Sequence, residues 1–84
     1  MAHHIEIPDS VISSLRLPEQ EIEPRLRAEL AIALYARGIL SFGKASELAD
    51  LSRSAFAEQL SERGISRHYT EEELAQDLAY ARRQ

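Results

Sequence analysis

The side chains that could hold a metal ion are spaced so that they do not converge on one point. His3 and His4 are adjacent, and neighbouring residues of an extended segment point to opposite sides. The third histidine, His68, lies far along the chain. The glutamates at 71–73 are consecutive, and successive positions of a helix point about 100° apart. We therefore expect no metal site and no cofactor.

The residue types that nucleophilic catalysis needs are missing or wrongly placed. Cysteine is absent, which removes thiolate nucleophiles. None of the serines lies in the Gly-x-Ser-x-Gly context that exposes a nucleophile. The segment from Gly38 to Gly43 lacks the Gly-Lys-Ser/Thr ending of a phosphate-binding loop. Because 84 residues leave little room for a walled pocket, we expect a protein that is not an enzyme.

Residues 41–64 predict two short helices joined by a tight turn, which is the pattern of a helix-turn-helix unit. Ser41 is a good N-cap for a first helix that ends at about residue 49, and Ser52 caps the second. Asp50 falls at the turn, where a left-handed residue is needed, and aspartate is one of the few residues besides glycine that adopts this conformation. Large apolar residues, Phe56 and Leu60 among them, would fill the angle between the helices.

The second helix of this hairpin is predicted to carry mainly small and polar side chains on its outer face. Small and polar side chains there would let a helix seat in a DNA groove, because bulky ones would block it. The residues expected on this face are Arg53, Ser54, Ala57, Glu58 and Ser61. An ordinary helical hairpin with a solvated polar face explains the same pattern, since such hairpins also occur in folds that never bind nucleic acid.

The charge distribution limits how strongly this hairpin could bind DNA. The net charge is −4, whereas phosphate contact needs a local excess of cations. Residues 41–69 carry four basic and four acidic side chains, residues 1–40 carry four and six, and residues 70–84 carry two and four. The hairpin segment is the least acidic part but is not basic, so we expect salt-sensitive binding that needs a dimer or a partner.

The rest of the chain predicts an all-α domain of about five helices spanning residues 1–84. Residues 1–8 alternate polar and apolar side chains, so they form either an extended segment that pairs across a dimer or a frayed terminus. Helices are predicted at about 9–15 and 23–37, with Gly38 ending the second. A last helix over 70–84 begins with a capping box, Thr70 with Glu73. The small size also favours a homodimer.

Taken together, these motifs resemble a small prokaryotic family of uncharacterised helix-turn-helix proteins. Its members are commonly classed as antitoxins of toxin–antitoxin pairs and are often encoded beside a PIN-domain nuclease. The resemblance covers nearly the whole chain, although that family often has glycine where this sequence has Asp50. The matching residues include Leu34, Tyr35, Gly38, Leu40, Ser41, Gly43, Lys44, Ala45, Glu47, Leu48, Ala49, Leu51, Ser52, Arg53, Phe56, Leu60, Gly64, Ile65 and the run from Tyr69 to Leu78.

The resemblance implies an antitoxin with two binding surfaces. One would bind operator DNA and regulate transcription, with Ser52, Arg53, Ser54 and Ala57 nearest the bases and Lys44 and Arg67 near phosphates. The other would bind the toxin through the last helix, using Leu74, Leu78, Arg82 and Arg83. The two arginines have a second explanation, since cations are favoured at a helix C-terminus.

A protein-interaction adaptor without DNA binding is the competing hypothesis, and the neutral balance of residues 41–69 favours it. In either case no apolar run approaches the roughly 20 residues of a membrane span, and no signal peptide is visible. The absence of cysteine agrees with a reducing compartment, so a cytoplasmic location is expected.

Overall fold

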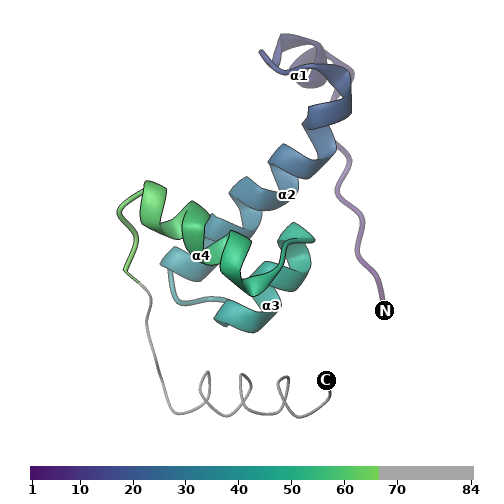
Figure 1. The fold of residues 1–84 in the computed structure, drawn as a ribbon. Coiled ribbons are helices and arrows are strands. Elements are labelled where there is room, and N and C mark those ends of the chain that lie inside the picture. Colours follow the sequence, from purple (N-terminus) through teal and green to yellow (C-terminus); the bar gives the residue numbers. More distant parts are fainter. Residues whose placement is uncertain (67–84) are drawn as a thin grey trace.

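The computed structural model describes residues 1–66, and this part of the chain is all-α (Figure 1). Its four helices are α1 (Asp9–Ser14), α2 (Glu19–Ala36), α3 (Phe42–Ala49) and α4 (Arg53–Glu62). The all-α prediction is therefore confirmed, with four helices in the described range rather than about five. The last predicted helix, 70–84, lies outside the described residues. Residues 1–8 precede α1 without forming a strand.

Helix α2 begins earlier than the sequence pattern suggested. The prediction placed its start near Pro24, because proline is favoured in a first helical turn. The structure instead has Pro18 as N-cap, whose carbonyl accepts a hydrogen bond from the Glu21 N–H at 2.9 Å, and Pro24 lies inside the helix. Glu19 and Glu21 then occupy the first turn, where the helix dipole favours acids.

Two glycines end helices, Gly38 as predicted, and each has a positive φ. After α2, Gly38 has φ 73° and the Ile39 N–H donates to the Leu34 carbonyl at 2.9 Å. After α4, Gly64 has φ 68° and the Ile65 N–H donates to the Leu60 carbonyl at the same distance. The apolar half of this motif differs between the two sites, because Ile65 packs against the core whereas Ile39 remains 66% exposed.

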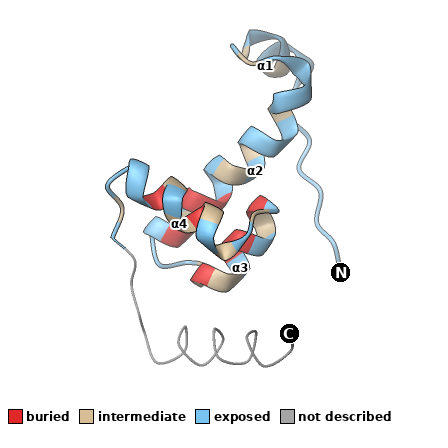
Figure 2. Ribbon diagram, viewed as in Figure 1, coloured by how far each residue is buried: buried red, intermediate tan, exposed pale blue. Residues whose placement is uncertain are grey.

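The buried residues lie where α3 and α4 meet the C-terminal half of α2 (Figure 2). Three aromatic rings form the centre of this core. Phe56 lies edge-on to both Tyr35 and Phe42, with ring centroids 6.2 and 5.5 Å apart, and Tyr35 and Phe42 are 5.8 Å apart. Such edge-to-face pairs contribute about 0.5–1.5 kcal/mol each beyond their burial. The remaining buried apolar residues are Ala31, Ile32, Ala45, Ala49 and Leu60.

The N-terminal half of the described chain extends away from this core. Neither α1 nor the first three turns of α2 contains a buried residue, and Figure 1 shows them projecting beyond α3 and α4. Between residues 1 and 66, no helix has both the length and the apolar character needed to cross a membrane.

Candidate nucleic-acid interface

The hairpin over α3 and α4 has the caps and the turn that the sequence predicts. The hydroxyl of Ser41 accepts the Lys44 N–H at 3.3 Å, and that of Ser52 accepts the Ala55 N–H at 3.1 Å. Between the helices, Asp50 has φ 57° and ψ 40°, in the left-handed region. The Leu51 N–H then donates to the Ser46 carbonyl at 3.0 Å, which closes the end of α3.

Several small residues of α3 are buried. Ala45 and Ala49 are buried in the core cluster. Ser46 is buried as well, and its hydroxyl lies within hydrogen-bonding distance of the Phe42 carbonyl at 3.1 Å and the Gly43 carbonyl at 2.9 Å. Because the Ser46 hydroxyl is hydrogen-bonded within its own helix, it is not an unpaired polar group in the core.

The outer face of α4 is exposed, but fewer of the predicted residues lie fully on it. Ser54, Glu58 and Ser61 face solvent, and Ser52 at the N-cap is also exposed, with its hydroxyl 3.3 Å from that of Ser54. Ala57, which was predicted on this face and near the bases, is half-buried and packs against the core.

Arg53 was also predicted on the outer face, and the structure places it to one side. Its side chain is half-buried and lies across the first turn of α3. Nη2 of Arg53 would be 3.0 Å from a Cβ atom at Gly43. Arg53 therefore contacts the junction of the two helices, where the N-terminal turns of α3 and α4 approach each other.

Lys44 lies on the exposed surface of α3 and forms an ion pair with Glu47. Nζ of Lys44 is 2.9 Å from Oε2 of Glu47, and the two side chains are 64% and 69% exposed. Exposed pairs of this kind contribute only about 0–1 kcal/mol. A phosphate group could therefore compete with Glu47 for the lysine at little cost.

A second ion pair holds the end of α4 against α2. Nη1 and Nη2 of Arg63 lie 2.9 and 2.6 Å from the two carboxylate oxygens of Glu29, and Arg25 approaches the same carboxylate at 3.2 Å. The hydrogen bond from Arg63 lowers the pKa of Glu29, burial opposes this shift, and the hydrogen bond from Arg25 adds to it; the same bond to Glu29 raises the pKa of Arg63. Sequence reasoning missed this pair, because a separation of 34 residues leaves no local signal.

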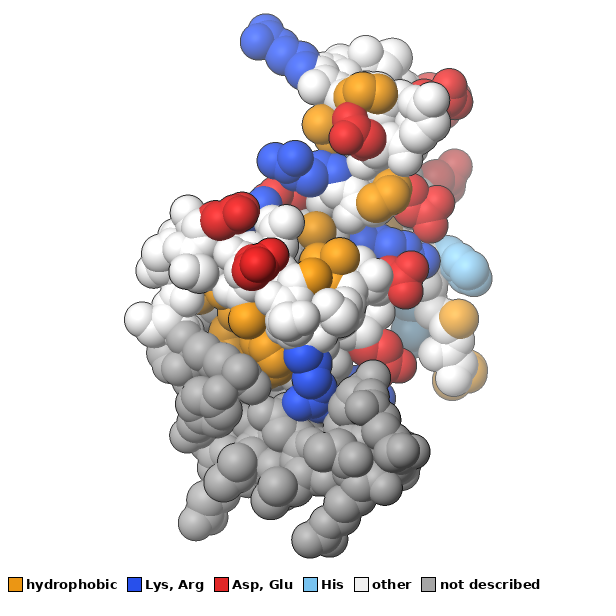
Figure 3. Space-filling model, in the orientation of Figure 1, with side chains coloured by type: hydrophobic (Ala, Val, Ile, Leu, Met, Phe, Trp, Pro, Cys, Tyr) orange, Lys and Arg blue, Asp and Glu red, His pale blue; other side chains and the backbone are white. Residues whose placement is uncertain are grey.

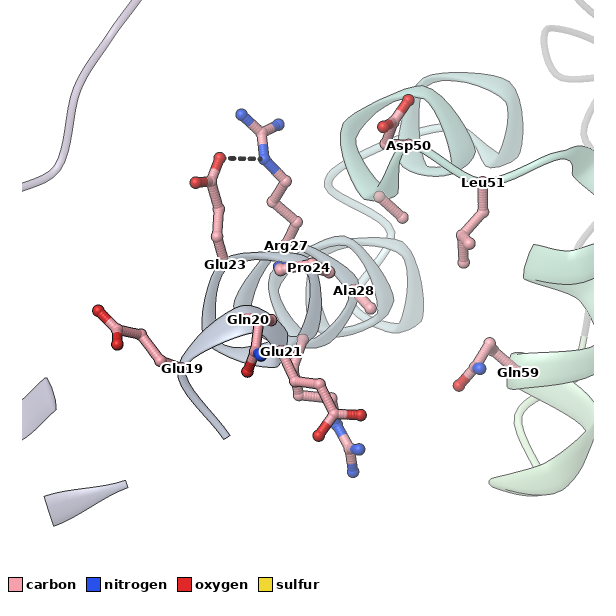
Figure 4. A pocket seen from close by; sticks show the side chains of 12 residues that line it. Glu19, Gln20, Glu21, Glu23, Pro24, Arg27, Ala28, Asp50, Leu51 and Gln59 are labelled. Atoms are coloured by element: carbon pink, nitrogen blue, oxygen red, sulfur yellow. Dashed lines mark hydrogen bonds and ion pairs between the residues drawn. The ribbon is translucent and has the colours of Figure 1, made fainter. Parts of the chain in front are cut away.

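An open groove separates the first half of α2 from the turn after α3 (Figure 4). Its volume is about 720 Å³, and Asp50, Leu51 and Gln59 line the side opposite α2. Arg27 lies on the α2 side, where Nε is 3.3 Å from Glu23 and Nη1 donates to the Leu48 carbonyl at 3.4 Å. The other lining residues include Glu19, Glu21, Arg25 and Ala28. Sequence reasoning also missed this groove, which carries more acids than bases.

Charges of both signs are mixed around the hairpin. On the face drawn in Figure 3, basic and acidic side chains lie among one another without forming a continuous basic patch. Arg67, the other predicted phosphate contact, lies outside the described residues, as do the predicted toxin contacts Leu74, Leu78, Arg82 and Arg83. Over residues 1–66, no group of three or more His, Asp or Glu side chains is placed to hold a metal ion.

Comparisons with known proteins place the chain in a family. The profile of the Uncharacterised protein family (UPF0175) matches residues 1–83. A UPF0175 protein of Aeropyrum pernix is 48% identical over 79 residues, covering 94% of this chain and 84% of its own length. A UPF0175 protein of Archaeoglobus fulgidus is 42% identical over 62 residues, covering 74% of this chain and 71% of its own length.

No solved structure matches the chain. The match over residues 1–83 nevertheless covers α1 to α4, the capped hairpin and the left-handed turn at Asp50. The chain is a member of the UPF0175 family.

Proposed function

We propose that this protein is the antitoxin of a toxin–antitoxin pair, which binds operator DNA through α3 and α4 and neutralises a PIN-domain nuclease. The observation that supports DNA binding is the exposed outer face of α4, presented by a capped helix directly after the Asp50 turn. The assignment as an antitoxin, and the nuclease as its target, follow from the family resemblance carried by the motifs of the hairpin.

Fluorescence anisotropy with the DNA upstream of the protein's own gene tests the first part. Affinity is measured between about 50 and 200 mM salt, with a scrambled fragment of equal length for comparison. Lys44→Ala should weaken binding and reduce the salt slope by about 1 per subunit. Arg16→Ala is the control, because it removes an exposed cation outside the hairpin. A Lys44→Ala variant with unchanged affinity and slope would contradict a phosphate contact at Lys44.

A truncation tests the second part. In the proposal the C-terminal segment 70–84 binds the nuclease, and Arg82 and Arg83 pair with carboxylates of its metal site. A variant ending at residue 69 should then keep α1 to α4 and its DNA binding but no longer inhibit the nuclease encoded beside it. Full inhibition by the truncated protein would reject this segment as the inhibitory element.

A protein-interaction adaptor is the second candidate function, and one observation favours it. Lys44 already has Glu47 as a partner, and Glu58 lies in the middle of the exposed face of α4. A surface with this charge would repel phosphates and attract a basic protein. Equal and weak binding to the upstream and scrambled fragments, with and without the neighbouring gene product, would favour the adaptor.

A further inference from the structure

Helix α2 carries apolar residues on two opposite sides. One side contains Ala31, Ile32 and Tyr35, which are buried against α3 and α4. Ile22, Leu26, Leu30 and Ala33 recur every three or four residues, and at about 100° per residue they lie on the other side. A helix with two apolar sides normally packs between two layers of structure, and α3 and α4 supply only one.

The outer α2 stripe, as we call this second side, begins and ends with charges of opposite sign. Its residues in order are Glu19, Ile22, Leu26, Leu30, Ala33 and Arg37. Leu30 is 42% exposed and Ala33 is exposed, whereas Ile22 and Leu26 are half-buried. The unburied apolar surface of the stripe is thus concentrated at Leu30 and Ala33. Ile39, which follows Arg37 closely, adds a further exposed apolar side chain at the same end.

Two pairs of residues in the outer α2 stripe complement each other under a two-fold axis, whereas Ile22 would face Leu34 and Ala33 would face Glu23. If two α2 helices cross antiparallel with the axis at position 28, Leu26 of one copy faces Leu30 of the other. Glu19 of one copy then faces Arg37 of the other, at both ends of the contact. A parallel arrangement would place Glu19 against Glu19, which is unfavourable. Isologous dimers need a patch that complements itself in this way.

We propose that the outer α2 stripe is the contact between two copies of this chain, packed antiparallel about position 28. An 18-residue helix is about 27 Å long, which gives room for several layers of side chains along the contact. Because α3 and α4 pack on the opposite side of α2, both hairpins stay accessible in the dimer. The inference depends on α2 alone and goes beyond the proposed function, since it holds whether or not the hairpins bind DNA.

Sedimentation equilibrium of the full chain tests the proposal. The wild-type protein should reach the mass of two 9.5-kDa chains at micromolar concentration. Leu30→Glu introduces two charges at the centre of the contact, so it should raise the dissociation constant at least about 30-fold. Position 30 is exposed enough for the variant to keep its fold, which circular dichroism checks.

Charge reversal tests the antiparallel direction. Glu19→Arg and Arg37→Glu should each raise the dissociation constant about 5- to 10-fold, and the double variant should recover most of that loss. Glu21→Arg is the matched control, because it makes the same charge change in the same helical turn but lies about 200° round the helix from Glu19, away from the outer α2 stripe. It should leave the dissociation constant unchanged.

Two results would overturn the proposal. One is a full chain that stays monomeric at about 1 mM, which includes the case in which residues 67–84 cover the stripe themselves. The other is a dimer that Leu30→Glu does not weaken. Neither readout involves DNA or a nuclease, so failure of the dimer contact and failure of the proposed function are distinguishable.

Discussion

The guanidinium of Arg53 lies across the backbone of Gly43, so that Nη2 would be 3.0 Å from a Cβ atom at that position. This contact joins the first turn of α4 to the first turn of α3. It is close enough for any larger residue at position 43 to move the arginine. The contact gives Gly43 a role in placing a cation beside the hairpin, although Gly43 itself lies inside a helix.

Gly43→Ala separates helix propensity from this contact. Alanine stabilises a helix interior by about 0.5–1 kcal/mol relative to glycine, and only the flexible end of Arg53 must shift. We expect a net gain in the free energy of unfolding of less than about 1 kcal/mol, measured by urea denaturation. In an Arg53→Ala background the gain should be larger, because the contact is gone. A loss of more than about 1 kcal/mol in the single variant would show that Arg53 is rigidly held.

Asp50→Gly tests the cost of the left-handed turn. Aspartate tolerates φ 57° better than most residues but is still less favourable there than glycine. We expect Asp50→Gly to stabilise the fold by about 0.5–1 kcal/mol and Asp50→Ala to destabilise it by a similar amount. The pair of variants is its own control, because both remove the carboxylate. Equal changes in the free energy of unfolding would mean that loss of the carboxylate charge, and not backbone conformation, causes both changes.

The features that the sequence predicted correctly are local ones. Ser41 and Ser52 bond to amides three residues ahead, and the left-handed Asp50 and Gly38 follow from where each helix must end. Such hydrogen bonds depend on neighbours in the chain, so spacing alone identifies them. The predicted start of α2 was wrong by several residues, because the helix begins directly after its N-cap Pro18 and Pro24 lies inside it.

The features that could not be predicted depend on how the helices cross. Ala57 was assigned to the outer face from helical spacing, and packing of α4 on the core turns it inward. Arg53 lies beside Gly43 for the same reason. The Glu29–Arg63 pair joins residues 34 positions apart, and no periodicity connects them. DNA binding by the hairpin stays a prediction.

The Glu29–Arg63 pair predicts how stability depends on pH. The pKa of Glu29 is lowered from its ordinary value of 4.5, so the pair stabilises the fold fully above that value. The stabilisation is lost as the pH falls through the lowered pKa of the folded state. Because the Glu29 side chain is 47% exposed, we expect Arg63→Gln to cost only about 0.5–1.5 kcal/mol at pH 7.

Denaturation of wild type and Arg63→Gln at a series of pH values measures this effect. The difference in the free energy of unfolding between the two proteins should be constant from pH 7 to about 5 and should shrink below about pH 4. Lys44→Gln is the control, since it breaks an exposed ion pair within one helix and should cost less than about 0.5 kcal/mol. A difference that grows as the pH falls would mean that Arg63 does not favour the charged form of Glu29.

Glu58→Gln tests directly whether the exposed face of α4 meets DNA. Glu58 lies between Ser54 and Ser61 on that face, where a carboxylate would repel a phosphate backbone. If the face enters a groove, the neutral variant should bind the upstream DNA about 3- to 10-fold more tightly, with its stability unchanged within about 0.5 kcal/mol. Glu21→Gln removes an equal charge from the groove side of α2 and should leave DNA affinity as it is. If both variants tighten binding equally, only net charge matters and α4 has no special position on the DNA. If neither does, the adaptor becomes the better description, because the charge at the centre of the supposed reading face would then have no effect on DNA.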